Sequence, residues 1–130
     1  MNLEESYTEE DSFFFDSYAF FEILKGNKNY EIYKKCEIIT TKLNIFELYL
    51  GLLREVNEVT AEKFLNKYYK FVIDFDENVI KGAAKLKNKL NNRNLSMADC
   101  IGYILSKQLG IKFLTGDKEF ETLDNVEFVK

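Results

Sequence analysis

Histidine, proline and tryptophan are absent from this sequence of 130 residues, and cysteine occurs only twice. Without histidine the chain cannot carry a Ser-His-Asp triad, a Cys-His pair, a histidine general base or a His-containing zinc site. The two cysteines, Cys36 and Cys100, show no C-x-x-C spacing, and we expect them to be buried free thiols. Carboxylates are therefore the side chains left for catalysis.

Long apolar stretches and a basic leader are also missing. No apolar run approaches the ~20 residues that a membrane span needs. The first eleven residues, MNLEESYTEED, are acidic where a signal peptide would be basic. We therefore expect a soluble protein of the cytoplasm. The net charge of −4 is concentrated in this lead, so it argues only weakly against an RNA partner.

Short apolar segments alternate with helical patterns along the rest of the chain. Strands are expected at 12–15, 37–41, 71–73, 112–114 and 126–129. Helices are expected at 17–24, 30–35, 43–56, 60–69, from Asp76 to the Asn91-Asn92 turn, at 96–109 and at 118–122. This alternation predicts one α/β domain over residues 12–130, an α/β/α sandwich with a mainly parallel sheet, preceded by the acidic lead 1–11. In such sheets the functional crevice lies at the carboxyl ends of the strands.

Two aspartates occupy that edge of the predicted sheet. Asp16 follows the first strand, and Asp117 follows the strand at 112–114 in the segment FLTGD. Each is equally well explained as a turn residue or helix N-cap, so position alone does not make either of them functional.

Glu47 stands inside the apolar helical segment NIFELYLGLL. No lysine or arginine lies three or four residues away to compensate its charge, and burying an uncompensated carboxylate is costly. This favours a cation or a hydrogen-bond donor beside Glu47. The alternative is a narrow solvated stripe shared with Asn44 and Gly51.

Asp99 opens the helix at 96–109 and has a strong structural explanation. Ser96 as N-cap and Asp99 three residues later match a capping box. A carboxylate held by backbone donors at a helix N-terminus can still turn its second oxygen toward a crevice, so capping and metal binding are compatible.

Together these features resemble PIN domains. Asp16-Ser17 after the first strand, Glu47 in the apolar helix, Asp99 at a helix start and TGDKEF at 115–120 match in order and spacing. The segment VIDFDENVIKGAAKLKNKL also looks like the third strand and next helix of stand-alone PIN toxins of the VapC type. The similarity runs over residues 12–129.

The resemblance implies a parallel sheet whose strand ends gather carboxylates around Mg²⁺ or Mn²⁺ to hydrolyse phosphodiester bonds. The acidic set would be Asp16, Glu47, Asp99 and Asp117, with Ser17 and Thr115 as supporting hydroxyls. We thus expect a metal-dependent endoribonuclease, the toxin of a type II toxin–antitoxin pair, with a cognate antitoxin and a homodimeric state. The alternative is a non-catalytic PIN-like module that binds RNA or protein. Stand-alone PIN toxins usually begin almost at the first strand, so the acidic lead of about eleven residues departs from their pattern.

One strongly basic run accompanies the acids. It comprises Lys81, Lys85, Lys87, Lys89 and Arg93, with no acidic residue from 78 to 98. A solvated helix face explains such a run. The functional alternative is attraction of the RNA backbone by Lys81, Lys85, Lys89 and Arg93.

Overall fold

Four short parallel strands form the centre of the computed structural model, which describes residues 7–130. They are β1 (Ser12–Phe15), β2 (Glu37–Ile39), β3 (Lys112–Thr115) and β4 (Val126–Phe128). Their order in the sheet is β2-β1-β3-β4, and Phe14 of β1 lies opposite Ile39 of β2 and Phe113 of β3. The predicted parallel sheet is confirmed.

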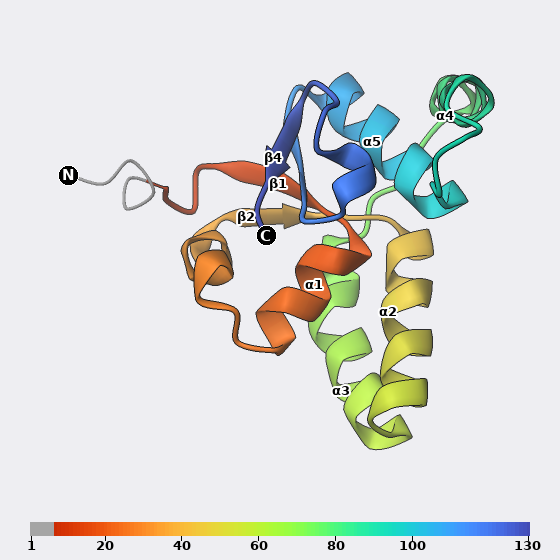
Figure 1. Ribbon diagram of the computed structural model, residues 1–130. Coiled ribbons are helices and arrows are strands. Elements are labelled where there is room, and N and C mark those ends of the chain that lie inside the picture. The colour runs from red at the N-terminus through yellow and green to blue at the C-terminus, as the bar shows by residue number, and fades with distance from the viewer. Residues whose placement is uncertain (1–6) are drawn as a thin grey trace.

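Helices cover both faces of this sheet. The α-helices are α1 (Ser17–Leu24), α2 (Lys42–Glu55), α3 (Glu58–Tyr68), α4 (Glu77–Lys89) and α5 (Met97–Leu109). The 3₁₀ helices are η2 (Lys28–Lys35), η3 (Tyr69–Phe71) and η4 (Lys118–Phe120). Helices α1, α2 and α3 lie on one side and α4 and α5 on the other (Figure 1). The predicted α/β/α sandwich is therefore confirmed.

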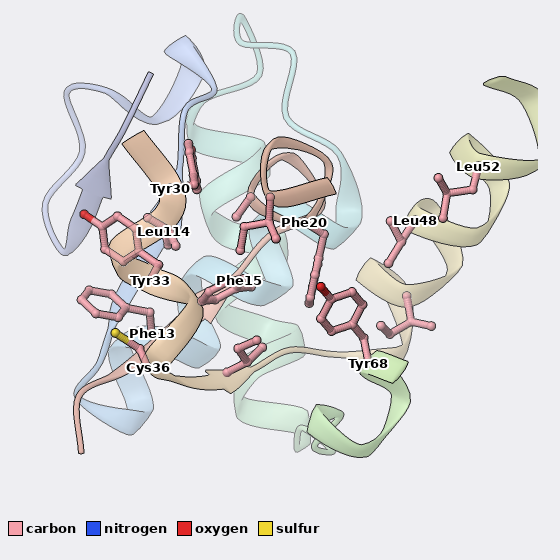
Figure 2. Packing of buried hydrophobic residues seen from close by; sticks show 14 of the residues in the cluster. Phe13, Phe15, Phe20, Tyr30, Tyr33, Cys36, Leu48, Leu52, Tyr68 and Leu114 are labelled. Carbon is pink, nitrogen blue, oxygen red and sulfur yellow. The ribbon is translucent and has the colours of Figure 1, made fainter. Parts of the chain in front are cut away.

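β1 is a strand because its side chains find apolar partners on both faces of the sheet. Phe13 and Phe15 point into a core shared with α1, η2, α2 and α3 (Figure 2). Phe14 points the other way and stacks on Phe113, with ring centroids 5.6 Å apart. The close approach of α5 depends on Gly102, where a Cβ would lie 2.5 Å from the Phe14 ring. Continuous burial on two faces is typical of a central parallel strand.

The strand predicted at 71–73 is wrong. Residues 69–71 form η3, and only Val72 makes an isolated parallel bridge, to Thr40 beyond the end of β2. Two hydrogen bonds hold this bridge, from the Thr40 amide to the Phe71 carbonyl (3.1 Å) and from the Ile73 amide to the Thr40 carbonyl (3.0 Å). The ladder goes no further because its partner ends there: Thr41, the next residue after Thr40, is the N-cap of α2.

The helix predicted at 60–69 begins earlier than expected. Asn57 is its N-cap and accepts a hydrogen bond from the Thr60 amide at 2.8 Å, so Thr60 is not the cap. The cap predicted at Ser96 is confirmed, and the helices expected from Asp76 and at 96–109 are present: Asp76 is the N-cap of α4, and Gly110 ends α5 in the left-handed conformation. Cys36 and Cys100 are buried and free, as predicted.

The described part of the acidic lead contacts the domain. The Tyr7 hydroxyl donates to Glu127 at 2.8 Å, and the Asp11 carbonyl accepts from the Glu37 amide at 2.8 Å. Glu4 and Glu5, on which part of the lead's predicted charge rests, lie outside the described residues. No helix in the described part of the chain is long and apolar enough to cross a membrane.

Candidate acidic site at the carboxyl edge of the sheet

Asp16 and Asp117 come together because β1 and β3 are neighbouring parallel strands. Phe15 pairs with Leu114, and the Asp16 amide donates to the Leu114 carbonyl at 3.5 Å. Both aspartates are also N-caps: Asp16 accepts from the Ala19 amide at 2.8 Å, and Asp117 accepts from the amide of Glu119 at 3.0 Å. Capping therefore fixes the position of each carboxylate at the strand ends.

Asp16 is the most enclosed acid of the site, with 2% of its surface exposed. Burial raises the pKa of its carboxyl well above the ordinary value, while hydrogen bonds from the Thr115 hydroxyl and the Ala19 amide oppose the rise. The nearby charges of Asp99 and Asp117 raise it further. Ionised Asp16 thus lacks enough compensation from the protein itself.

Asp99 holds the capping box that its spacing with Ser96 predicts. Each residue accepts from the other's backbone amide at 3.1 Å. Burial raises the pKa of Asp99 to about 6, and the charges of Glu47 and Asp117 add to the rise. The hydrogen bonds from Ser96 lower this pKa, but they do not cancel the burial.

Glu47 reaches the site from α2 through a chain of polar side chains. The Ser17 hydroxyl donates a hydrogen bond to the Glu47 carboxylate at 2.5 Å. The side-chain amide nitrogen of Asn44 donates in turn to the Ser17 hydroxyl at 3.5 Å. Asn44 in turn accepts from the Thr41 hydroxyl at 2.7 Å. Asn44 is completely buried, so the alternative of a solvated stripe beside Glu47 is wrong at that position.

Asn44 is the site residue that sequence reasoning missed. It stands one helical turn before Glu47, on the same face of an otherwise apolar helix. This spacing was the available signal, because a buried amide next to a carboxylate needs polar partners. The partner that gives it meaning, Ser17, comes from α1 and becomes visible only in the fold.

Thr115-Gly116-Asp117 forms a tight exit from β3. The Thr115 hydroxyl accepts from the Asp117 amide at 3.1 Å while it donates to Asp16. A Cβ at Gly116 would lie 2.3 Å from the Val129 carbonyl oxygen and 2.4 Å from the Tyr18 ring. Only glycine fits there, so it lets this loop bring Asp117 to the edge of the sheet.

Four carboxylates thus share one region without a cation from the described residues. Each ion pair found within residues 7–130 lies elsewhere: Glu22–Lys25, Glu31–Lys34 and Asp124–Lys107. Within the same residues no three acidic or cysteine side chains converge tightly enough to hold an ion among them. Mg²⁺ usually keeps several waters and binds through one or two carboxylates together with a substrate phosphate. This all-oxygen donor set therefore fits a hydrated Mg²⁺ or Mn²⁺ ion.

The basic residues lie outside this group of acids. Lys81, Lys85 and Lys89 follow one exposed stripe of α4, on the opposite side from the face that packs on α5. The Arg93 guanidinium donates to the Glu119 carbonyl at 2.8 Å and so ties the segment after α4 to η4. Arg93 therefore has a structural partner next to the helix that Asp117 caps.

Comparisons with known proteins agree with this architecture. The PIN domain family model matches residues 13–126. A toxin–antitoxin complex from Klebsiella pneumoniae contains a chain that is 14% identical, with a TM-score of 0.67 over 87% of this chain and 93% of that one. VapBC2 from Rickettsia felis, crystallised with a DNA fragment from its promoter, gives 14% identity and a TM-score of 0.67 over 91% and 97%. No curated protein matches the sequence.

Proposed function

The chain belongs to the PIN domain family, and from this premise we propose that it is an endoribonuclease that depends on Mg²⁺ or Mn²⁺. The observation that carries the proposal is the nearness of the four acids at one edge of the sheet: Asp99 and Asp117 raise the pKa of Asp16, and Glu47 and Asp117 raise that of Asp99. Burial and mutual repulsion oppose ionisation of Asp16 and Asp99. The positive charge of a divalent cation would favour their ionised forms and so offset both effects. Strongly shifted carboxyl groups in such a place are typical of functional sites.

In the proposed site a bound Mg²⁺ or Mn²⁺ would acidify a water molecule and offset charge on the scissile phosphate. Asp16, Asp99 and Asp117 would hold the hydrated ion directly or through water. Thr115 fixes one side of the Asp16 carboxylate. Ser17 occupies one oxygen of Glu47, so the other oxygen can accept a hydrogen bond from the attacking water and orient it.

We propose further that the chain is the toxin of a toxin–antitoxin pair and binds an antitoxin. This is supported by the two structural neighbours, which come from such complexes. An apolar groove of about 500 Å³ between α2, α4 and α5 offers a surface for the partner. Two residues that line it, Ile80 and Met97, are 51% and 62% exposed. Ile80→Asp should weaken the complex with the antitoxin, which we expect a neighbouring gene to encode, and leave RNA cleavage intact.

The proposed activity is tested by incubating the protein with a mixed pool of structured and unstructured RNAs in Mg²⁺, Mn²⁺ or EDTA. We expect cutting of single-stranded RNA in either metal and none in EDTA. Asp99→Asn should lose most of the activity, whereas Asp124→Asn, a matched change at an acid outside the site, should keep it. If cutting never appears, the chain is a non-catalytic PIN-like module. If Asp99→Asn cuts like the unchanged protein, the cleavage does not use the acidic site.

A further inference from the structure

The end of α3 and η3 carries a second basic segment, KFLNKYYKF, at residues 63–71. Lysines alternate with aromatic residues there, and no acidic residue lies between 63 and 73. The Lys67 ammonium is 5.3 Å from the centre of the Tyr68 ring, and that of Lys70 is 5.3 Å from the Phe71 ring. These are distances at which a cation and an aromatic face attract each other.

This segment borders a pocket of about 350 Å³. Lys34, Lys67 and Lys70 line it together with Tyr68, Phe71 and aliphatic residues from α1 and β2, and none of the lining residues is acidic. Lys34 is already paired with Glu31 at 3.1 Å. Within residues 7–130, neither Lys67 nor Lys70 has an acidic partner at ion-pair distance. The pocket thus offers two cations for an anion from outside the chain.

The pocket is separate from the acidic site. Asp16 caps the start of α1, whereas Ile23 and Leu24 at the end of α1 line the pocket. An eight-residue α-helix is about 12 Å long, so the two places are roughly that far apart along α1. A single RNA strand lying in the acidic site could therefore reach the pocket with a nucleotide a few positions further along.

We propose that this pocket is a second binding site for single-stranded RNA. Lys67 and Lys70 contact backbone phosphates, and the half-buried Phe71 ring supports a base. Lysines that neutralise phosphates beside aromatic rings that stack on bases are the combination by which proteins hold single strands. The volume suits one nucleotide, since ligand pockets begin near 300 Å³. RNA is favoured over an acidic peptide because each phosphate of RNA is joined to a planar base that can stack on the ring, whereas Asp and Glu side chains bring no planar base. The inference rests on the proposed function in taking RNA as the ligand.

The test measures binding of a labelled oligouridylate to the full chain in EDTA by fluorescence anisotropy over a range of salt concentrations. The double variant Lys67→Gln/Lys70→Gln should bind several-fold more weakly, and its salt dependence should flatten by about 1.4 units of slope for two lost phosphate contacts. The matched control is Arg54→Gln/Lys112→Gln, which removes the same charge at exposed positions that line neither site. The control should retain the slope of the unchanged protein.

A second variant tests the ring. Phe71→Leu should weaken oligouridylate binding about fivefold or more but leave binding of an abasic phosphodiester strand unchanged. A thermal melt establishes that this variant is folded. Equal slopes for the two double variants would overturn the proposal. It would also be overturned if Lys67 and Lys70 were needed for binding polyglutamate but not for binding RNA.

Binding and cutting separate this inference from the proposed function. A chain that binds RNA through Lys67 and Lys70 but never cuts it in Mn²⁺ contradicts the nuclease proposal and supports the second site. A chain that cuts RNA, with binding unaffected by the Lys67→Gln/Lys70→Gln change, contradicts the second site alone.

Discussion

Raising the pH of the metal-free protein from about 4.5 to about 7 should destabilise it through Asp99. The pKa of Asp99 is about 6 in the folded chain, above its ordinary value of 3.8, chiefly because the group is buried. Between these two values the folded state binds more protons than the unfolded state. The stability from protonated Asp99 is therefore fully present below the unfolded pKa and is lost as the pH rises through about 6. Asp16, whose pKa is also raised, acts in the same direction.

The size of the effect follows from the shift. A rise from 3.8 to about 6 spans about two pKa units, each equivalent to about 1.4 kcal/mol, so Asp99 accounts for up to ~3 kcal/mol. Unfolding entropy is about 2.1 cal/mol/K per residue, which for this chain converts the loss into a fall of roughly 10 °C in Tm. Mn²⁺ should offset the fall, because the proposed ion would bind the ionised form of Asp99.

The assay is thermal melting in EDTA across this pH range. Asp99→Asn stays neutral and can still accept from Ser96, so it should lose the contribution of Asp99 to the pH-dependent fall, keep that of Asp16, and be more stable than the unchanged protein near neutral pH. Asp124→Asn is the control of opposite sign, since hydrogen bonds from Tyr103 and Lys107 lower the pKa of Asp124. Parallel pH profiles for the unchanged protein and Asp99→Asn would refute the repulsive, buried environment inferred for Asp99.

Three further outcomes are expected. Asp117→Asn should have a higher Tm than the unchanged protein in EDTA, because one repelling charge is gone. An ion at ~100 times its dissociation constant should add roughly 2.7 kcal/mol to the stability of the unchanged protein, and Mn²⁺ should raise the Tm of the variant by less. If Mn²⁺ raised both Tm values equally, a shared metal site would be excluded. Lys85→Gln/Lys89→Gln should flatten the salt dependence of RNA binding by about 1 to 2 units, and an unchanged slope would make α4 a solvated face only. Gly116→Ala should cost about 1–3 kcal/mol in unfolding experiments, because its Cβ would lie 2.3 Å from a backbone carbonyl oxygen. Gly82→Ala should cost less, because its Cβ would lie 3.0 Å from Cγ2 of Ile104 and a small shift of that side chain would accommodate it.

The elements that the sequence predicts well are those in which local signals and packing agree. The strand at 12–15 is apolar throughout and lies between two helical layers. Ser96 and Gly110 bracket α5 by capping chemistry that depends on their own backbone neighbourhood. The segment 71–73 has a similar apolar composition, but its pairing depends on a partner segment that ends where Thr41 caps α2, which its own composition does not reveal.

The candidate site divides in the same way. Asp16, Asp99 and Asp117 could be predicted from the sequence, because each lies at a strand end or a helix start. The polar chain from Thr41 through Asn44 to Glu47 was not predictable in full, because its link is Ser17 on another helix. The lysine–aromatic pocket likewise combines residues of α1, η2, β2, α3 and η3. Contacts between distant segments are the part that a single sequence does not encode locally.

The strand order also bears on when the chain could become active during its synthesis. β1 lies in the middle of the sheet, yet its partner β3 follows it in the sequence by roughly one hundred residues. Contacts of such long range form late, because much of the chain must be available before they close. Asp16 is made early, but it has neither Thr115 nor Asp117 beside it until β3 has left the ribosome and docked. A nascent chain would therefore lack the assembled acidic edge for most of translation, and the proposed nuclease activity could begin only after almost all of the domain had been made.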